Sequence, residues 1–350
     1  MNKLLPYILF LASVLSFSLS GQAQYNDGTY RFLNTTNSAR VAALGGVALP
    51  IYDNDIQLGV YNPSLINAEM NNRLALSYVD YYTDANFATV QYGRSFNKLG
   101  SFVGTVQFQN YGNFTYTSES GEEQGSFTAS DYSVTLGWGR QLTDHWSIGA
   151  NLKYAGVQYE SYSAGALAVD VAGSYHTDDN LCVSLVLRNA GVQLFNDIDA
   201  NRSPLPFSLS AGLSKRLEHL PFTFFIVYDE IQRWNQVYDD PLQQQYDPIT
   251  GELLTMRPTE KFFKNLACHL VIGGELYIGK NIVLRGSYNY GRRYDMKAPQ
   301  SRALVGFACG VGVRVKMFEI NYGLSRLSQT GSPNYISVLV NLNEFRRAVK

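Results

Sequence analysis

Charge is scarce in this chain. Only 16% of its 350 residues are Asp, Glu, Lys or Arg, and the formal net charge is −1 at pH 7. Without a surplus of positive charge, the chain has no general electrostatic attraction to nucleic acid. Cysteine is also scarce: Cys182, Cys268 and Cys309 are the only three. At most one disulfide can form within the chain, which excludes a small scaffold held together by disulfides.

Long apolar runs are missing after the first residues. Lys3 precedes an apolar run from Leu4 to about Leu19, and small residues follow up to Ala23. This order is typical of a secretory signal peptide, so we predict a signal at 1–23 that is cleaved after Ala23. The alternative is a membrane anchor, but the run is short for a helix that spans a bilayer. No later stretch is apolar for long enough to predict a transmembrane helix.

Aromatic residues and glycine are plentiful, with 25 Tyr, 19 Phe and 30 Gly. This composition, with so little charge, favours strands over helices. Apolar side chains also alternate with small or polar ones. Within residues 131–142, every second position from 132 to 138 is apolar: Tyr132, Val134, Leu136 and Trp138. Such alternation places one face of a strand in an apolar medium and the other in a polar one.

Marking every run of this kind predicts about fourteen strands, many of a length that crosses a membrane. They lie at 74–82, 88–95, 101–111, 131–142, 146–158, 166–175, 181–189, 207–217, 222–230, 269–276, 282–290, 304–313, 318–324 and 334–342.

Short and long connections alternate along most of the predicted strands, except at the first hairpin, 83–87. Outer-membrane barrels have this pattern, because their periplasmic turns are tight and their outer loops are long. We therefore predict an all-β fold: a transmembrane antiparallel β-barrel in the Gram-negative outer membrane, in contact with membrane lipid. The even number of strands places both termini at the periplasmic side. A large secreted β-sandwich is the alternative.

The expected organisation has three parts: the signal peptide 1–23, an amino-terminal segment 24–73 that packs at or in the barrel, and the barrel 74–345 with long extracellular loops. Four charged residues, Lys153, Asp170, Arg188 and Arg285, could face the lumen. They are either paired or solvated there, or they line a selective pore.

No sequence motif predicts catalysis. Residues 274–281 come close to the nucleotide-binding pattern G-x-x-x-x-G-K-[ST], but Asn281 replaces the required hydroxyl and a strand pattern follows where a helix is needed. The four histidines lack metal-ligand spacing. No nucleophile, base and orienting group can be placed together, which argues against an extracellular hydrolase. We expect no enzymatic activity, no cofactor, no metal site and no nucleotide or nucleic-acid partner.

The longest predicted loop is 231–268, and loops of this length are usually functional or disordered. It carries aromatic and arginine side chains of the kind that dominate protein interfaces. These candidate partner-binding residues are Arg233, Trp234, Tyr238, Tyr246, Phe262 and Phe263. The alternative is that they pack within the loop or lie at the membrane surface.

The region 31–67 carries a denser signature. It contains Asn37-Ser38-Ala39-Arg40, then Gly45-Gly46, and later Asn62-Pro63. This pattern resembles the PorV/PorQ branch of FadL-like outer-membrane proteins, most of all the PorQ-like members of the type IX secretion system. The match is dense over about 35 residues, and elsewhere it rests on the barrel pattern and on length. The motif residues are expected to be structural.

The resemblance implies a fourteen-stranded barrel without catalytic activity. It implies that the barrel anchors a PorZ-like surface protein through its extracellular loops. Through that protein it would join the attachment complex that contains PorU and PorV. The alternative function is a FadL-like transporter of hydrophobic small molecules. The many Ser, Gly and Asn residues on the predicted lumen faces mildly disfavour transport of this kind.

Overall fold

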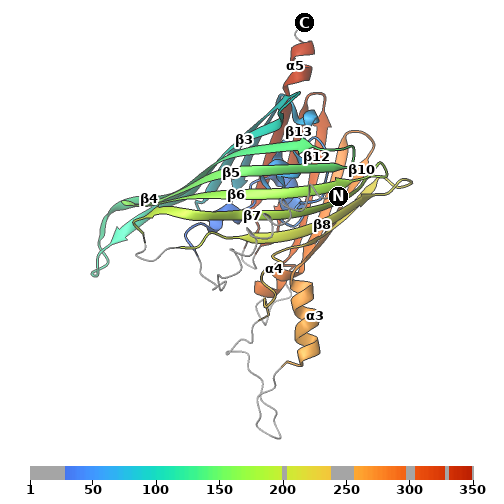
Figure 1. Ribbon diagram of the computed structural model, residues 1–350. Coiled ribbons are helices and arrows are strands. Elements are labelled where there is room, and N and C mark those ends of the chain that lie inside the picture. The colour runs from blue at the N-terminus through green and yellow to red at the C-terminus, as the bar shows by residue number, and fades with distance from the viewer. Residues whose placement is uncertain (1–27, 199–202, 238–255, 297–303, 328–330, 349–350) are drawn as a thin grey trace, which may run out of the picture.

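A computed structural model of the protein describes residues 28–198, 203–237, 256–296, 304–327 and 331–348. Fourteen antiparallel strands form one closed barrel in which each strand pairs with its neighbours in sequence and β1 pairs with β14 (Figure 1). The predicted fold class is therefore confirmed. The sandwich alternative is wrong, because a closed barrel has no second sheet to pack against.

The strands have these bounds: β1 Arg73–Asp80, β2 Asn86–Phe96, β3 Gly100–Thr117, β4 Glu123–Gln141, β5 Trp146–Tyr159, β6 Tyr162–His176, β7 Leu181–Asn196, β8 Ser208–Arg216, β9 Phe222–Tyr228, β10 Leu270–Ile278, β11 Ile282–Asn289, β12 Phe307–Val315, β13 Phe318–Ser325 and β14 Asn334–Asn341.

Alternation along each strand separates two environments. On β4, Val134 and Leu136 are 49% and 53% exposed on the outer surface, whereas the intervening Thr135 is 3% exposed and faces inward. The same alternation of buried and exposed positions runs along most strands. A surface of exposed valine, leucine and aromatic side chains over a polar interior is what a barrel in lipid requires.

The connections define two ends of the barrel. The short-turn end has the turns 97–99, 142–145, 177–180, 217–221, 279–281 and 316–317, and the helix α5 (Leu342–Ala348) follows the last strand there. The long-loop end carries the helices α3 (Pro258–Cys268) and α4 (Tyr290–Asp295). In Figure 1, α5 and α3 lie at opposite ends of the barrel. The carboxyl-terminal side chains Arg346, Arg347 and Lys350 lie outside the described part.

Two predicted loops at the long-loop end are in fact strand. Residues 112–117 and 123–130 continue β3 and β4 beyond the other strands as a projecting two-stranded ribbon, joined by a turn at 118–122 (Figure 1). Both faces of the ribbon are exposed, so its sequence does not alternate. Cross-strand pairs stabilise it instead: the ring of Phe127 stacks on Phe114 and also contacts Tyr116. The predicted loop 159–165 is likewise wrong, because β5 and β6 run almost to their shared turn.

The helices were not predicted, although their sequences carry local signals. Pro258 begins α3 and Glu260 forms a 2.8 Å ion pair with Lys264 one turn later. The Asn289 side chain caps α4 by accepting from the Arg292 N–H at 3.0 Å. Within the described ranges, no helix is long and apolar enough to cross a membrane.

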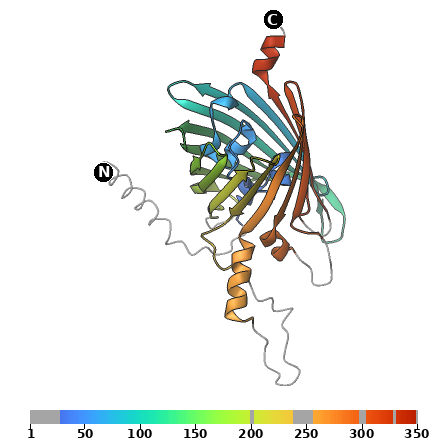
Figure 2. The ribbon, with the colours of Figure 1, turned by 90° about the vertical axis from the view of Figure 1, so that its right-hand side faces the viewer.

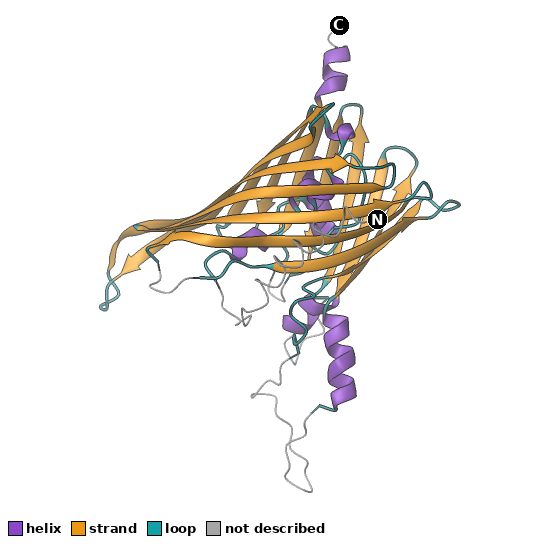
Figure 3. Ribbon diagram, viewed as in Figure 1, coloured by secondary structure: helices purple, strands orange, loops and turns teal. Residues whose placement is uncertain are grey.

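Residues 28–72 lie inside the barrel. They form the short helices η1 (Arg31–Asn34), α2 (Ala39–Ala43), η2 (Ile56–Val60), η3 (Pro63–Leu65) and η4 (Ala68–Met70). Figures 2 and 3 show these pieces enclosed by the strands. Nearly all of 36–51 and 55–66 is buried. We call residues 28–72 the plug.

Leu136→Arg tests the outer surface. A charge on the lipid face near the bilayer centre costs about 2 to 4 kcal/mol, so the free energy of unfolding in phospholipid vesicles should fall by that amount. The matched control is Leu220→Arg, since Leu220 is 59% exposed but lies in a turn at the short-turn end. Equal effects of the two substitutions on urea unfolding would contradict a lipid-facing β4.

Candidate functional site: the plug and the outer vestibule

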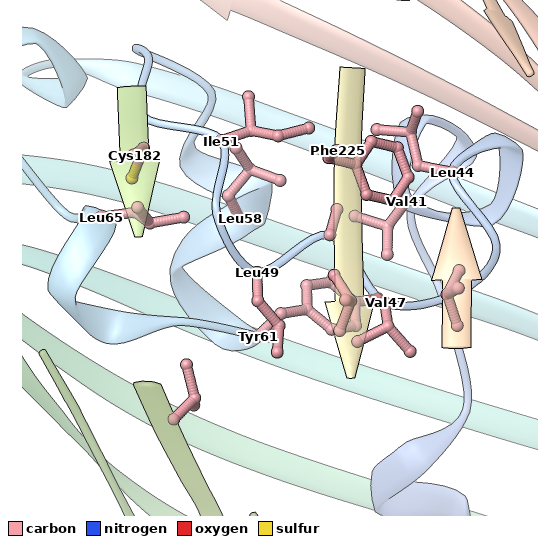
Figure 4. Packing of buried hydrophobic residues seen from close by; sticks show 14 of the residues in the cluster. Val41, Leu44, Val47, Leu49, Ile51, Leu58, Tyr61, Leu65, Cys182 and Phe225 are labelled. Carbon is pink, nitrogen blue, oxygen red and sulfur yellow. The ribbon is translucent and has the colours of Figure 1, made fainter. Parts of the chain in front are cut away.

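The plug touches all fourteen strands. Its helices pack on β1 to β6 and on β11 to β14. The remaining strands are reached by an apolar cluster that joins Val41, Leu44, Leu58 and other plug residues to Val186 on β7, Phe225 on β9 and Val271 on β10 (Figure 4). On β8, the Ser214 hydroxyl donates to the carbonyl of Pro50 in the plug at 2.5 Å. The plug thus fills the cross-section of the barrel.

Arg40 is the charged centre of the plug–wall contact. Its guanidinium donates two hydrogen bonds of 2.9 Å to the two carboxylate oxygens of Glu275 on β10. It also forms ion pairs of 2.6 Å and 3.2 Å with Asp53 and Asp55 in the plug. Burial by itself lowers the pKa of Arg40, but the three carboxylates hold that pKa well above its usual value. A parallel two-bond pair of this type is both strong and directional.

The ionic contact continues into the wall. Arg285 on β11 donates to Glu275 at 2.7 Å and to the side-chain oxygen of Asn321 on β13 at 2.6 Å. Glu275 is fully buried and Arg285 is 6% exposed. Glu275 is therefore shared by two guanidiniums, one from the plug and one from the wall, and a buried carboxylate needs such partners.

Gly45 and Gly46 follow α2 with φ angles of +84° and +87°. This left-handed region favours glycine. A Cβ on Gly45 would also lie 2.6 Å from Val271, and one on Gly46 would lie 2.8 Å from the guanidinium of Arg292, so a side chain at either position would force its neighbour to shift. The paired glycines thus let the plug backbone approach the wall at two neighbouring points.

The second half of the motif begins a helix and holds it to the wall. The Asn62 side chain accepts from the Ser64 N–H at 3.0 Å and donates to the Leu49 carbonyl at 2.6 Å. Pro63 occupies the first position of η3, where its missing N–H costs no helical hydrogen bond. The Ser64 hydroxyl lies 2.5 Å from the Ser174 hydroxyl on β6.

The other motif residues are buried at the plug–wall boundary. The Ala39 N–H donates to the Ser337 hydroxyl on β14 at 3.0 Å. Ser38 caps α2, and its hydroxyl also donates to the Gln57 side chain at 3.0 Å. The Asn37 N–H donates to the Tyr61 hydroxyl at 3.2 Å. Asn37, Ser38 and Ala39 therefore form hydrogen bonds within the plug and from the plug to β14.

The four candidate lumen charges face inward and are paired. Lys153 lies 2.7 Å from Asp170, Arg285 lies 2.7 Å from Glu275, and Arg188 lies 3.7 Å from Asp229. Lys153 and Asp170 are 3% and 0% exposed. They support the packed interior rather than line an open selective pore.

At the long-loop end the plug forms one side of a cavity of about 1230 Å³. We call this cavity the vestibule. Plug residues such as Phe32 and Gly46, wall residues such as Tyr111 and Tyr335, and loop residues such as Phe207 line it. Among the described residues, its charged lining consists of three arginines and one carboxylate: Arg31, Arg233, Arg292 and Glu230.

Gly28 also lines the vestibule, so the described chain begins at the long-loop end. The position of the amino terminus lies outside the described residues. Its periplasmic placement and the signal peptide therefore stay predictions.

The candidate partner-binding residues are partly brought together. Trp234 contacts the ring of Phe262 on α3, and Phe262 contacts Phe263. Their exposures are 39%, 50% and 66%. Arg233 turns toward Glu230 at 3.2 Å and lines the vestibule. Tyr238 and Tyr246 lie outside the described residues.

The match to the nucleotide-binding pattern has the predicted strand structure. Residues 274–281 form the β10–β11 hairpin, with no helix after Lys280. The described part holds no group of His, Cys, Asp and Glu that could bind a metal. Cys182, Cys268 and Cys309 are free.

Sequence reasoning did not identify the partners of Arg40 or the position of Arg292. Asp53 and Asp55 form a turn, in which the Asp53 side chain accepts from the Asp55 N–H at 2.9 Å, and both also pair with Arg40. Glu275 falls on an inward-facing position of β10, and a carboxylate at such a position requires a cation. That position was the sequence signal from which an ion pair with the plug could have been predicted.

The fold is similar to that of solved barrels. The Pseudomonas putida toluene transporter TodX matches with a TM-score of 0.54 and 13% identity, over 87% of this chain and 97% of TodX. A TodX deltaS2S3 mutant, described as a monoaromatic hydrocarbon channel, matches with 0.51 and 15% over 87% and 97%. A Pseudomonas aeruginosa FadL homologue gives 0.48 and 10% over 88% and 98%. No protein-family model and no curated protein matches.

These similarities show the fold alone. The chain is a closed antiparallel β-barrel with a fold similar to that of TodX, and an amino-terminal segment lies inside its strands.

Arg40→Met tests the ionic centre. It leaves Asp53 and Asp55 without their cation and takes from Glu275 one of its two guanidinium partners. Breaking a buried pair in this way costs about 3 to 5 kcal/mol. We expect a lower thermal unfolding midpoint and faster proteolysis within 28–72. The double variant Arg40→Met with Glu275→Gln should lose less than the two single variants together, because both single variants break the same Arg40–Glu275 pair. The control is Lys280→Met on an exposed turn, and an Arg40 variant as stable as this control would contradict the assignment.

Proposed function

We propose that this protein is an outer-membrane channel that admits small molecules from the long-loop end. The proposal rests on the vestibule, which is open to solvent at the loops and has the plug as one of its sides. TodX, which has a similar fold, is a toluene transporter, and this supports the choice of a channel. Passage to the other end requires the plug to move, because the plug touches every strand.

The chemistry of the vestibule indicates the class of solute. Aromatic and aliphatic side chains, among them Phe32, Tyr111 and Phe207, alternate with arginines. Binding cavities for organic molecules combine an apolar lining with a few placed polar groups. The solute is therefore a small molecule with both an apolar part and a polar group, and its passage involves no chemical step.

A disulfide that locks the plug to the wall tests this function. The Ser64 and Ser174 hydroxyls are 2.5 Å apart, so Ser64→Cys with Ser174→Cys brings two sulfur atoms within bonding reach. The background should be Cys182→Ala, because Cys182 lies 3.8 Å from Ser184, which contacts Ser174. In proteoliposomes, the oxidised pair should abolish the flux of small charged aromatic and aliphatic solutes, and reduction should restore it.

The two single-cysteine variants are the controls, and their flux should not respond to oxidation. Equal flux in the locked and reduced protein would mean that solutes do not depend on plug movement. Absence of flux in the wild-type protein under all conditions would reject the channel.

A second function is favoured by a different feature. The exposed rings of Trp234, Phe262 and Phe263 form a continuous apolar surface beside α3 at the long-loop end. Large aromatic residues of this kind dominate binding energy in protein interfaces. Together with the resemblance to PorQ-like proteins of the type IX secretion system, they support anchoring of a PorZ-like surface protein and, through it, of the PorU and PorV attachment complex.

Phe262→Asp with Phe263→Asp separates anchoring from transport. Charges at these positions should release the PorZ-like protein from the membrane fraction and abolish its copurification, while the barrel remains inserted and solute flux stays unchanged. The matched control is Phe345→Asp, because Phe345 is 51% exposed on α5 at the opposite end. Full retention of the PorZ-like protein by the double variant would exclude anchoring through this surface.

A further inference from the structure

Arg292 is the unusual charged group of the vestibule. It lies on α4, is partly buried and faces the cavity. Its guanidinium donates to the Ser325 hydroxyl at 3.1 Å. In the described part of the chain no carboxylate forms an ion pair with it, unlike the buried Arg40 and Arg285. A partly buried guanidinium that lacks a carboxylate partner is stabilised by a bound anion.

The groups around Arg292 suit an oxyanion. The Ser325 hydroxyl and the phenols of Tyr81 and Tyr335 line the same cavity. On the plug side, Gly46 lies next to the guanidinium, because a Cβ on Gly46 would be 2.8 Å from the Arg292 Nη2. The Thr36 hydroxyl donates to the Gly46 carbonyl at 3.3 Å. The hydroxyls of Ser325, Tyr81 and Tyr335 are therefore the candidate donors to an anion beside Arg292.

The charge of Arg292 indicates that the ligand is an anion. Among the described lining residues, Arg233 pairs with Glu230 at 3.2 Å, whereas Arg292 has no carboxylate at ion-pair distance. A phosphate monoester carries about −1.5 to −2 near neutral pH and has three acceptor oxygens. Guanidinium groups match the geometry of phosphate with parallel N–H donors.

We propose that the vestibule binds a phosphate monoester, with Arg292 as the residue that holds the phosphate group. This proposal rests on the proposed channel function, because the phosphate site would recognise the solute that the channel admits. The phosphate can come from a soluble molecule or from the phosphorylated headgroup of a lipid at the outer surface. Because Arg292 also contacts the plug beside Gly46, the ligand binds where the plug meets the wall.

Binding is measured on the full chain in detergent, without any transport step. Phenyl phosphate is titrated into the protein and its ³¹P NMR linewidth is followed. A micelle of phosphorylated lipid A serves as a competitor. We expect saturable broadening for the wild-type protein. Displacement by lipid A would show that a lipid headgroup also enters the site, whereas no displacement would assign the site to soluble phosphates, and both results support it.

The variants are Arg292→Gln and Arg292→Lys. Loss of a charge-assisted hydrogen bond corresponds to at least about a tenfold weaker affinity, so Arg292→Gln should bind at least tenfold more weakly. Arg292→Lys keeps the charge and should retain part of the affinity. The control is Arg314→Gln, because Arg314 is an exposed arginine at the short-turn end. Heat-dependent gel mobility verifies that each variant is folded.

The inference is overturned if the wild-type protein shows no saturable binding, if Arg292→Gln binds as tightly as the wild type, or if Arg314→Gln weakens binding equally. The proposed channel can fail separately: phosphate binding without any solute flux in the locking experiment would retain the site and reject the channel.

Discussion

The pairing of Arg40 with Glu275 is the contact on which the rest of the interior depends. A guanidinium with 4% exposure cannot remain in a barrel without carboxylates at bonding distance. Glu275 comes from the wall, whereas Asp53 and Asp55 come from the plug itself. The ionic centre therefore fixes both the fold of the plug and its position in the lumen.

Other features of the interior follow from the presence of a plug. Inward-facing positions of the strands carry hydroxyls and amides that bond the plug backbone, as Ser337 does to Ala39 and Ser287 does to the carbonyl of Ala43. The lumen is polar because it contacts a folded segment with many backbone groups to satisfy. This explains why inward-facing charges such as Lys153 and Asp170 are paired and buried.

The sequence predicts a strand correctly wherever one face of that strand meets lipid. Val134 and Leu136 alternate with Ser133 and Thr135 because the two faces meet different media, and all fourteen strands could be predicted from this rule. The ribbon of β3 and β4 beyond the membrane has water on both faces, so its strands carried no such signal.

The candidate site could be predicted only in part. Arg40 and the two glycines belong to a recognisable motif, but the motif does not reveal Glu275, which lies 235 residues away in sequence. Arg292 could not be found either. Its proposed role in anion binding follows from the absence of a carboxylate at ion-pair distance and from its position beside Gly46. Both are properties of the folded chain.

These features describe a barrel whose lumen is filled by the plug, with the vestibule at the long-loop end. The central claim is that residues 28–72 close the barrel at rest. Electrical recording of the purified protein in a planar lipid bilayer tests it most directly. The account predicts a closed baseline with no steady conductance after insertion. A stable ohmic conductance of the size expected for an open fourteen-stranded pore would contradict it.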